Sequence, residues 1–235
     1  MNKLAILAAS LLIFFGAALW YLAATDLTGF LRSQVITQAS LITKQQVDVK
    51  QVTLALEHGD ITLENFTISD THSSENALSI KKIRVKADTS TINAPVIIVE
   101  SVNFDKLHAN ITFSADGDNN FKQITQQIQS QFNYIDSYTP EEFKLKKKSS
   151  SKTAPATKMQ ILSINATNLT LTVDLQAVNG EVLTIEIPNL ALAAIGRDAP
   201  IDANFIGTNI TDSLIKAIIS LADIHYENAI EKKPN

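Results

Sequence analysis

The amino-acid sequence predicts a mainly β protein with helices (α+β), in which a single N-terminal transmembrane helix precedes a curved antiparallel sheet. Three observations support this prediction: an uncharged apolar run near the start, repeated alternation of apolar and polar residues, and segments with helical apolar spacing. The chain has 235 residues, of which 45% are hydrophobic and 19% charged. This length is sufficient for a substantial buried core. We expect roughly eight to ten strands, capped by amphipathic helices.

Residues 1–25 are predicted to be a membrane anchor. The stretch Leu4–Ala24, LAILAASLLIFFGAALWYLAA, has 21 residues and no charge, and a helix needs about 20 such residues to cross the hydrocarbon core. Lys3 precedes this stretch, so the N-terminus is expected in the cytoplasm and the rest of the chain outside it. A cleaved signal peptide is the alternative, but its apolar region is normally only about 7–15 residues long.

Three regions are expected after the anchor. Residues 26–136 form a first β module, which starts with a short amphipathic helix over 26–44 and ends with a helix over 121–135. Residues 137–158 form a Lys/Ser-rich disordered insertion without periodicity. Residues 159–235 form a second β module with a C-terminal helix, whose apolar part covers 212–224 and whose cap is Thr211 or Asp212.

The strand alternation breaks at three places: at Lys81-Lys82, where a bulge would explain it, at Asp105-Lys106, and at Thr167-Asn168. Two strand–break–strand segments, VNFDKLHANITF (102–113) and INATNLTLTVDL (164–175), match at an offset of 62 residues. This weak internal repeat suggests a duplicated module.

The sequence contains no recognisable catalytic or metal-binding pattern. It has no cysteine, its four histidines have no ligand spacing, and it lacks phosphate-loop and nucleophile-elbow motifs. His108 alternates with apolar neighbours and is predicted to face solvent. A net charge of −4 argues against a nucleic-acid partner. We therefore expect no catalytic residues, no cofactor and no metal, and an exported hydrolase is the least favoured alternative.

After the anchor the chain contains Phe66-Thr-Ile-Ser-Asp, the strand Ala77 to Asp88, the strand pair Val96 to Phe113, and Asn119-Asn120-Phe121 at a helix start. Together with the anchor, these segments resemble the AsmA-like family of Gram-negative, inner-membrane-anchored periplasmic proteins. The later ILSINATNLTLTV and IPNLALAAIG are similar to the family's second strand pair and closing strand. The resemblance covers most of the chain, as a pattern of strands and turns without a catalytic signature.

This resemblance implies a non-enzymatic periplasmic protein in envelope or outer-membrane lipid homeostasis, with phospholipid as a partner. The alternating strands would then form a groove that binds acyl chains. The candidate lipid-facing residues are Ile98, Val102, Phe104, Ile111, Phe113, Leu169, Leu171 and Val173. The same residues would equally form an ordinary closed core. A different function remains open, that of a membrane-tethered adaptor that docks another envelope protein through helix 212–224.

Overall fold

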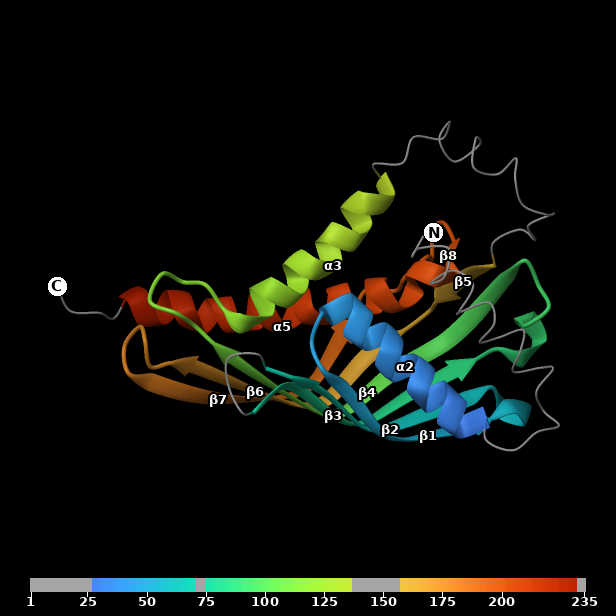
Figure 1. The fold of residues 1–235 in the computed structure, drawn as a ribbon, viewed down its shortest axis with the longest axis horizontal. Helices are drawn as coiled ribbons and strands as arrows, with labels where there is room; N and C mark the ends of the chain where they lie inside the picture. The colour runs from blue at the N-terminus through green and yellow to red at the C-terminus, as the bar shows by residue number, and fades with distance from the viewer. Residues whose placement is uncertain (1–26, 71–74, 137–156, 232–235) are drawn as a thin grey trace.

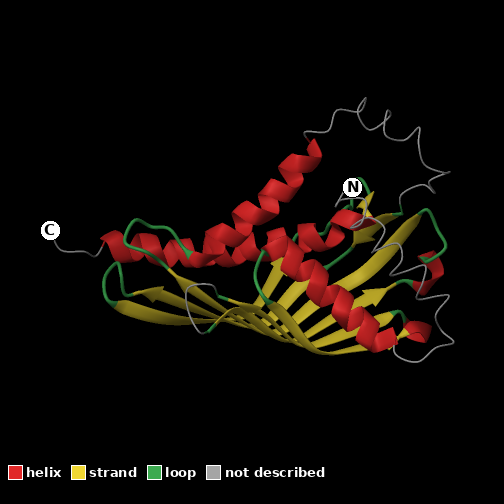
Figure 2. Cartoon of the chain, in the orientation of Figure 1, coloured by secondary structure: helices red, strands yellow, loops and turns green. Residues whose placement is uncertain are grey.

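In a computed structural model, residues 27–70, 75–136 and 157–231 are described, and they form an eight-stranded sheet with three long helices on one side (Figures 1 and 2). The helices are α2 (Leu27–Thr43), α3 (Asn120–Asp136) and α5 (Ile206–Glu231). The α+β class is therefore confirmed. The predicted anchor and residues 137–156 of the predicted insertion lie outside the described residues. Lys158, placed in that insertion, instead begins strand β5.

The strands follow the predicted alternation, and α3 lies between β4 and β5 in the chain. They are β1 (Val47–Ala55), β2 (Asp60–Ser69), β3 (Asn76–Ala87), β4 (Val96–Thr112), β5 (Lys158–Ile161), β6 (Ile164–Leu175), β7 (Glu181–Leu192) and β8 (Ile201–Asp202). The 3₁₀ helices are η1 (Leu56–His58), η2 (Thr89–Thr91) and η4 (Ala203–Phe205). The expected strand pair over 96–113 is one continuous strand, β4.

The sheet is mixed rather than wholly antiparallel, so this part of the prediction is wrong. Strands β1 to β4 pair antiparallel in sequence order, and β6 and β7 form an antiparallel hairpin. Between these two parts, β4 pairs in parallel with both β5 and β6. Alternation has a period of two residues in either kind of pairing, and it therefore cannot reveal the direction of a partner.

The internal repeat seen in the sequence is the register of this parallel pairing. Val102 lies beside Ile164, and Ala109 lies beside Leu171. The offset of 62 residues also holds between Val96 and Lys158, at the start of β5. The two similar segments thus lie side by side in one sheet, where equivalent residues share a face.

In each of the six long strands the alternation of inward and outward side chains shifts by one residue. The shifts lie side by side across the sheet, along a line that we call the crease. The two inward apolar residues that flank this line on a strand are three positions apart instead of two, as Phe104 and Leu107 are. The hydrogen-bonded register is continuous across the line, because each strand takes the extra step opposite its neighbour's. The crease residues are Lys50, Asn65, Lys81, Lys106, Asn168 and Pro188.

Three of the crease residues have left-handed backbone conformations, one on β2 and one on each of the neighbouring strands β4 and β6. The φ angles are 51° at Asn65, 53° at Lys106 and 53° at Asn168. Asparagine tolerates this conformation, whereas lysine is strained in it. The breaks in alternation seen in the sequence at Asp105-Lys106 and Thr167-Asn168 lie on this line. The break at Lys81-Lys82 belongs to the same line and is not a bulge of one strand.

Replacing Lys106 by asparagine is expected to raise the free energy of unfolding by about 1 kcal/mol, because asparagine relieves left-handed strain. Urea titration of both proteins measures this difference. Lys81→Asn is the matched control, since Lys81 lies opposite Lys106 but outside the left-handed region. Equal stabilisation by both substitutions would contradict the assignment of strain to Lys106.

Helices α3 and α5 begin at different kinds of signal. The Asn119 side chain accepts a hydrogen bond from the Lys122 backbone N–H at 3.0 Å and so caps α3, which was expected over 121–135. Helix α5, in contrast, begins at Ile206, before the predicted 212. Thr211 lies inside α5, and its hydroxyl donates to the Gly207 carbonyl at 2.8 Å. Asp202, which accepts from the Asn204 N–H at 2.9 Å, starts the preceding η4. The predicted cap was therefore wrong.

Candidate functional site, an apolar cavity under two helices

An apolar cavity of about 300 Å³ lies between the sheet, α2 and α5. Helix α2 contributes Gln34, Val35, Gln38, Ala39, Ile42 and Thr43. Helix α5 contributes Gly207, Ile210, Thr211, Leu214 and Ile215. The sheet contributes, from β2, β3 and β4, Leu63, Phe66, Ile68, Leu78, Ile80, Ile83, Val85, Val102 and Phe104. The cavity thus has a floor of three strands and two helical walls.

The lining of the cavity favours a hydrocarbon ligand. None of its lining residues is charged, and its polar side chains are two amides and two hydroxyls, from Gln34, Gln38, Thr43 and Thr211. A concave, mostly apolar site with a few polar groups is typical of small-molecule binding. An ionised group would lose its hydration there without gaining a charged partner. A hydrocarbon ligand has no such hydration to lose.

Two of the eight candidate lipid-facing residues line this cavity. Val102 and Phe104 project from β4 into it, and they are 2% and 4% exposed. Five others are buried in the core away from it: Ile111, Phe113, Leu169, Leu171 and Val173. Phe113, for example, stacks on Tyr226 of α5 with ring centroids 4.6 Å apart. The candidate set is therefore split between a cavity and a closed core.

Ile98 does not share a face with the other candidates. It is half-buried, whereas its neighbours Ile97 and Val99 are buried on the helix-covered face. The register between β3 and β4 shifts here, because Lys86 pairs with Ser101 and the next residue pairs with Val99. The extra residue between them, Glu100, inverts the alternation. Counting inward positions from Val102 therefore gave the wrong face for Ile98.

Most of the cavity lining comes from elements that the sequence reasoning did not connect with a site. The apolar stripe on the 26–44 segment, which includes Val35, Ala39 and Ile42, was visible as a helix signal. So was the alternation of β2 and β3. What the sequence did not show is that these elements face the same space as the start of α5, because that depends on how the helices pack.

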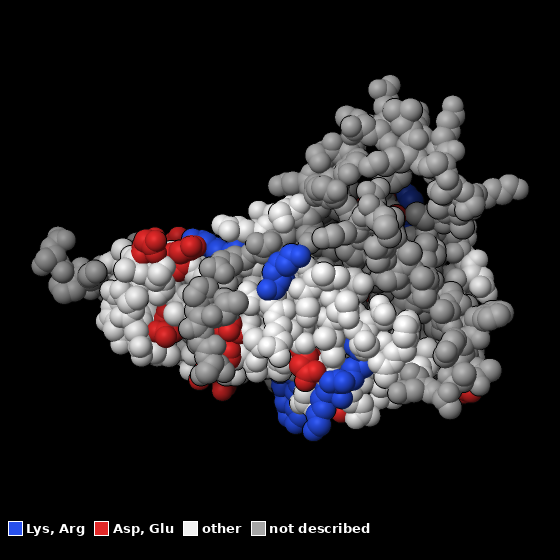
Figure 3. All heavy atoms as spheres, in the orientation of Figure 1, with Lys and Arg blue, Asp and Glu red and all other residues white. Residues whose placement is uncertain are grey.

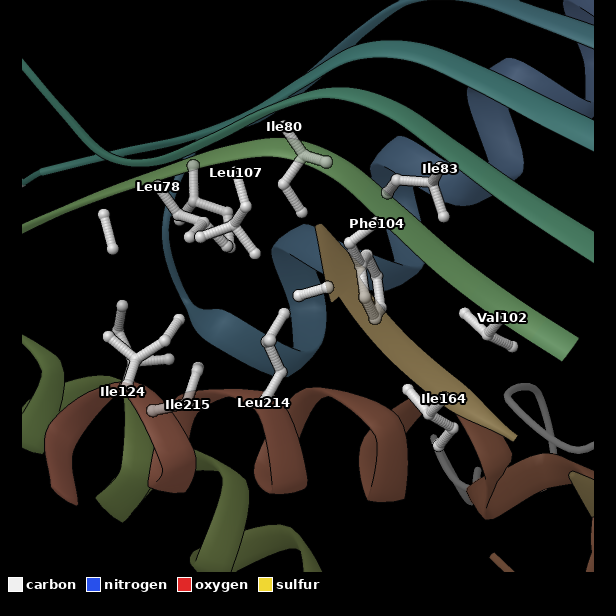
Figure 4. Close-up of a cluster of buried hydrophobic side chains, with 14 of the residues drawn as sticks. Leu78, Ile80, Ile83, Val102, Phe104, Leu107, Ile124, Ile164, Leu214 and Ile215 are labelled. Atoms are coloured by element: carbon white, nitrogen blue, oxygen red, sulfur yellow. The ribbon is translucent and has the colours of Figure 1, made fainter. Parts of the chain in front are cut away.

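Leu107 and Ile124 are buried near Leu78, which lines the cavity, but they do not line it themselves (Figure 4). Figure 4 shows Leu78 and Leu107 on the sheet facing Ile124 of α3, while Leu214 and Ile215 of α5 lie below the strands. Leu107 is 0% exposed and Ile124 is 1% exposed. The apolar stripe of α3 thus fills the space beyond the cavity.

The acidic and basic side chains of the β4–β6 region lie on the other face of the sheet and do not converge. His108 is exposed, as predicted, and its Nε2 lies 2.9 Å from the Thr172 hydroxyl. Asp105 accepts hydrogen bonds from Asn168 at 3.0 Å and Thr167 at 3.2 Å, which lower the pKa of its carboxyl. Within the described ranges, no group of three His, Cys, Asp or Glu side chains is placed to hold a metal ion.

A second, open depression of about 390 Å³ lies between α3 and α5, and it is polar. Its two lysines are already paired: Lys122 with Asp118 at 3.1 Å and Lys216 with Asp212 at 2.7 Å. Asp223 also lines it, and partial burial raises the pKa of this carboxyl. The charged groups visible in Figure 3 likewise form separate patches with uncharged surface between them.

No family model matches the chain, and no curated protein matches it.

One described helix, Ala203–Ile230, is long and apolar enough to cross a membrane by length and composition. Ile215, Ile218 and Ala222 of this helix are 0–1% exposed. In the fold, the helix thus covers one side of the sheet, as the core helix of a globular domain does.

Proposed function

We propose that this protein is a non-enzymatic, inner-membrane-anchored periplasmic protein that binds an acyl chain of a lipid and acts in envelope or outer-membrane lipid homeostasis. The observation that carries this proposal is the uncharged cavity between α2, α5 and the sheet. The apolar segment Leu4–Ala24 and the resemblance to the AsmA-like family support the location and the class of ligand.

The free energy for such binding would come from removing methylene groups from water. Each buried methylene contributes about 0.8 kcal/mol, and roughly eight of them would contribute about 6 kcal/mol before the costs of ordering the ligand. Two side chains that line the floor and could make these contacts are Phe66 on β2 and Phe104 on β4. Neither would need to leave the sheet to meet a ligand.

Lipid extraction from the purified protein tests this proposal. Residues 26–235 are produced without the apolar N-terminal segment, so that lipid around the anchor does not contribute, and are analysed by native mass spectrometry. The expected result is co-purified phospholipid or fatty acid at about one molecule per chain, a stoichiometry typical of a single enclosed site. A homogeneous, folded and lipid-free domain would contradict the proposal.

The second candidate function is that of a tethered adaptor. One observation favours it: Ile224 and Ile230, near the end of α5, are 55% and 46% exposed. The two residues are six positions apart, about 120° around the helix, so Ile224, at the end of the 212–224 segment, is the exposed apolar residue that such a contact would use. The lipid-free outcome of the extraction would favour this function, and Ile224→Ser would then be the variant to examine.

A further inference from the structure

We infer that the cavity is closed at one end and takes a single acyl chain, which enters with its methyl end first past Gly207 and leaves its ionised head group outside. This inference rests on the proposed function. It adds the direction of entry, the number of chains and the residue that controls access.

The closed end is formed by α3 and the strands below it. Phe121, Ile124 and Ile128 of α3 are 0–1% exposed, so this helix is firmly packed. Helix α3 also contacts both α2 and α5, the two walls of the cavity. In Figure 4, Ile124 faces Leu78 and Leu107 across this end. A chain that reaches Leu78 therefore meets filled space.

The other end of the cavity reaches Gly207, in the first turn of α5. A Cβ atom built on Gly207 would have no other atom within 4 Å, so the space beside this residue is empty. Gly207 is also not in the left-handed region, and a larger residue fits its backbone. Alanine would even favour the helix. The backbone at this position does not require glycine, and the lack of a side chain leaves the space beside it empty.

The Gly207 end of the cavity lies at the end of the molecule where α2 begins. Figure 1 shows that α2 and α5 both begin at the same end of the long axis of the molecule. Residue Leu27 starts α2 and follows the apolar segment Leu4–Ala24 almost directly. A lipid that leaves the bilayer thus arrives at the open end.

The volume of the cavity and its uncharged lining limit which part of a lipid can enter it. A volume of about 300 Å³ is at the lower limit of ligand sites, which are roughly 300–1,000 Å³, and this suits one chain rather than two. The lining has no cation to pair with a phosphate and no anion to pair with an amine. The head group therefore stays in water, and because the inner end is closed, the protein holds a chain and does not conduct it through.

Photo-cross-linking in a bilayer tests the direction of entry. The full chain is reconstituted in nanodiscs of phosphatidylethanolamine and phosphatidylglycerol. A trace of phosphatidylglycerol carries a diazirine either at the methyl end or next to the carbonyl of one acyl chain. Peptides cross-linked after illumination are identified by mass spectrometry. The methyl-end probe is expected to label peptides with Ile68 or Leu78, and the carbonyl-end probe peptides with Gln34 or Gly207.

Gly207→Phe tests access, because a phenyl ring on this residue would occupy the empty space. Cross-links at Ile68 and Leu78 are expected to fall by about tenfold, which corresponds to excluding roughly two methylenes from the cavity. Gly207→Ala is the matched control and should change them by less than about twofold. Thermal unfolding of both variants checks that they fold, and Gly207→Leu serves as a smaller plug if the phenylalanine variant does not.

The outcomes separate the two proposals. If neither probe labels the cavity in the wild-type protein, both the proposed function and this inference are overturned. If the cavity is labelled without any preference between probe positions, or equally in Gly207→Phe, this inference is overturned and lipid binding stands. Labelling of Ile68 and Leu78 by the carbonyl-end probe alone would reverse the direction of entry, and would also overturn it.

Discussion

Replacing Leu107 by alanine is expected to lower the free energy of unfolding by about 2–5 kcal/mol. Leu107 is 0% exposed and lies in the middle of β4, where it pairs with Ile80. Its side chain separates the cavity from the α3 packing (Figure 4). Removing it loses buried apolar surface and leaves a void that the neighbouring strands cannot close. Urea denaturation followed by circular dichroism measures the loss.

The control for this prediction keeps the volume and changes the shape. Leu107→Met is expected to cost less than about 1.5 kcal/mol, because methionine fills a similar space. A loss of less than about 1 kcal/mol in Leu107→Ala would show that the wall is loosely packed. The inner end of the cavity would then not be the firm barrier described here.

Replacing Gly59 by alanine is expected to lower the free energy of unfolding by about 3 kcal/mol, from left-handed strain together with a steric clash. Gly59 follows η1 in the turn between β1 and β2, with φ +69°, and a Cβ atom there would lie 2.2 Å from the Ala87 carbonyl oxygen. The Ala87 N–H also donates to the Gly59 carbonyl at 2.9 Å. The two backbones therefore cannot separate without losing a hydrogen bond. The shift of the urea midpoint measures the effect.

Gly180→Ala is the matched control for Gly59→Ala. Gly180 has φ +84°, but a Cβ atom there would have nothing within 4 Å. Its substitution should cost only the left-handed strain, about 1 kcal/mol. The difference between the two variants gives the cost of the close approach to Ala87. Equal losses would mean that the β1–β2 turn moves freely away from Ala87, at the end of β3.

The elements that could be predicted from the sequence are those determined by local physics. Helix α3 follows from the helical apolar spacing over 121–135, and the breaks at Asp105-Lys106 and Thr167-Asn168 follow from the alternation around them. Both depend only on residues close together in the chain. The start of α5 was missed for a related reason, because the Gly207–Thr211 segment contains glycine, threonine and asparagine, which usually favour turns and caps.

The candidate site depended on distant residues, and this limited its prediction. Val102 and Phe104 were found because the alternation of β4 puts them on the apolar face. Val102 and Phe104 border a cavity, whereas Leu171, three residues after Asn168 on β6, does not. This difference depends on the gap between α2 and α5. The parallel pairing of β4 with β6 was also missed, although the offset of 62 residues already contained its register.

The crease has a consequence for how the sequence of this sheet can change. Loss of one residue from a single strand at this line, such as Lys106, would turn Leu107, Ala109 and Ile111 outward and bring His108 inward. The neighbouring strands would stay in phase with one another and out of phase with the altered one. Single substitutions at the crease therefore keep the six strands in register, whereas inserting or deleting one residue there does not. Changes in the length of the chain are expected in the turns between the strands.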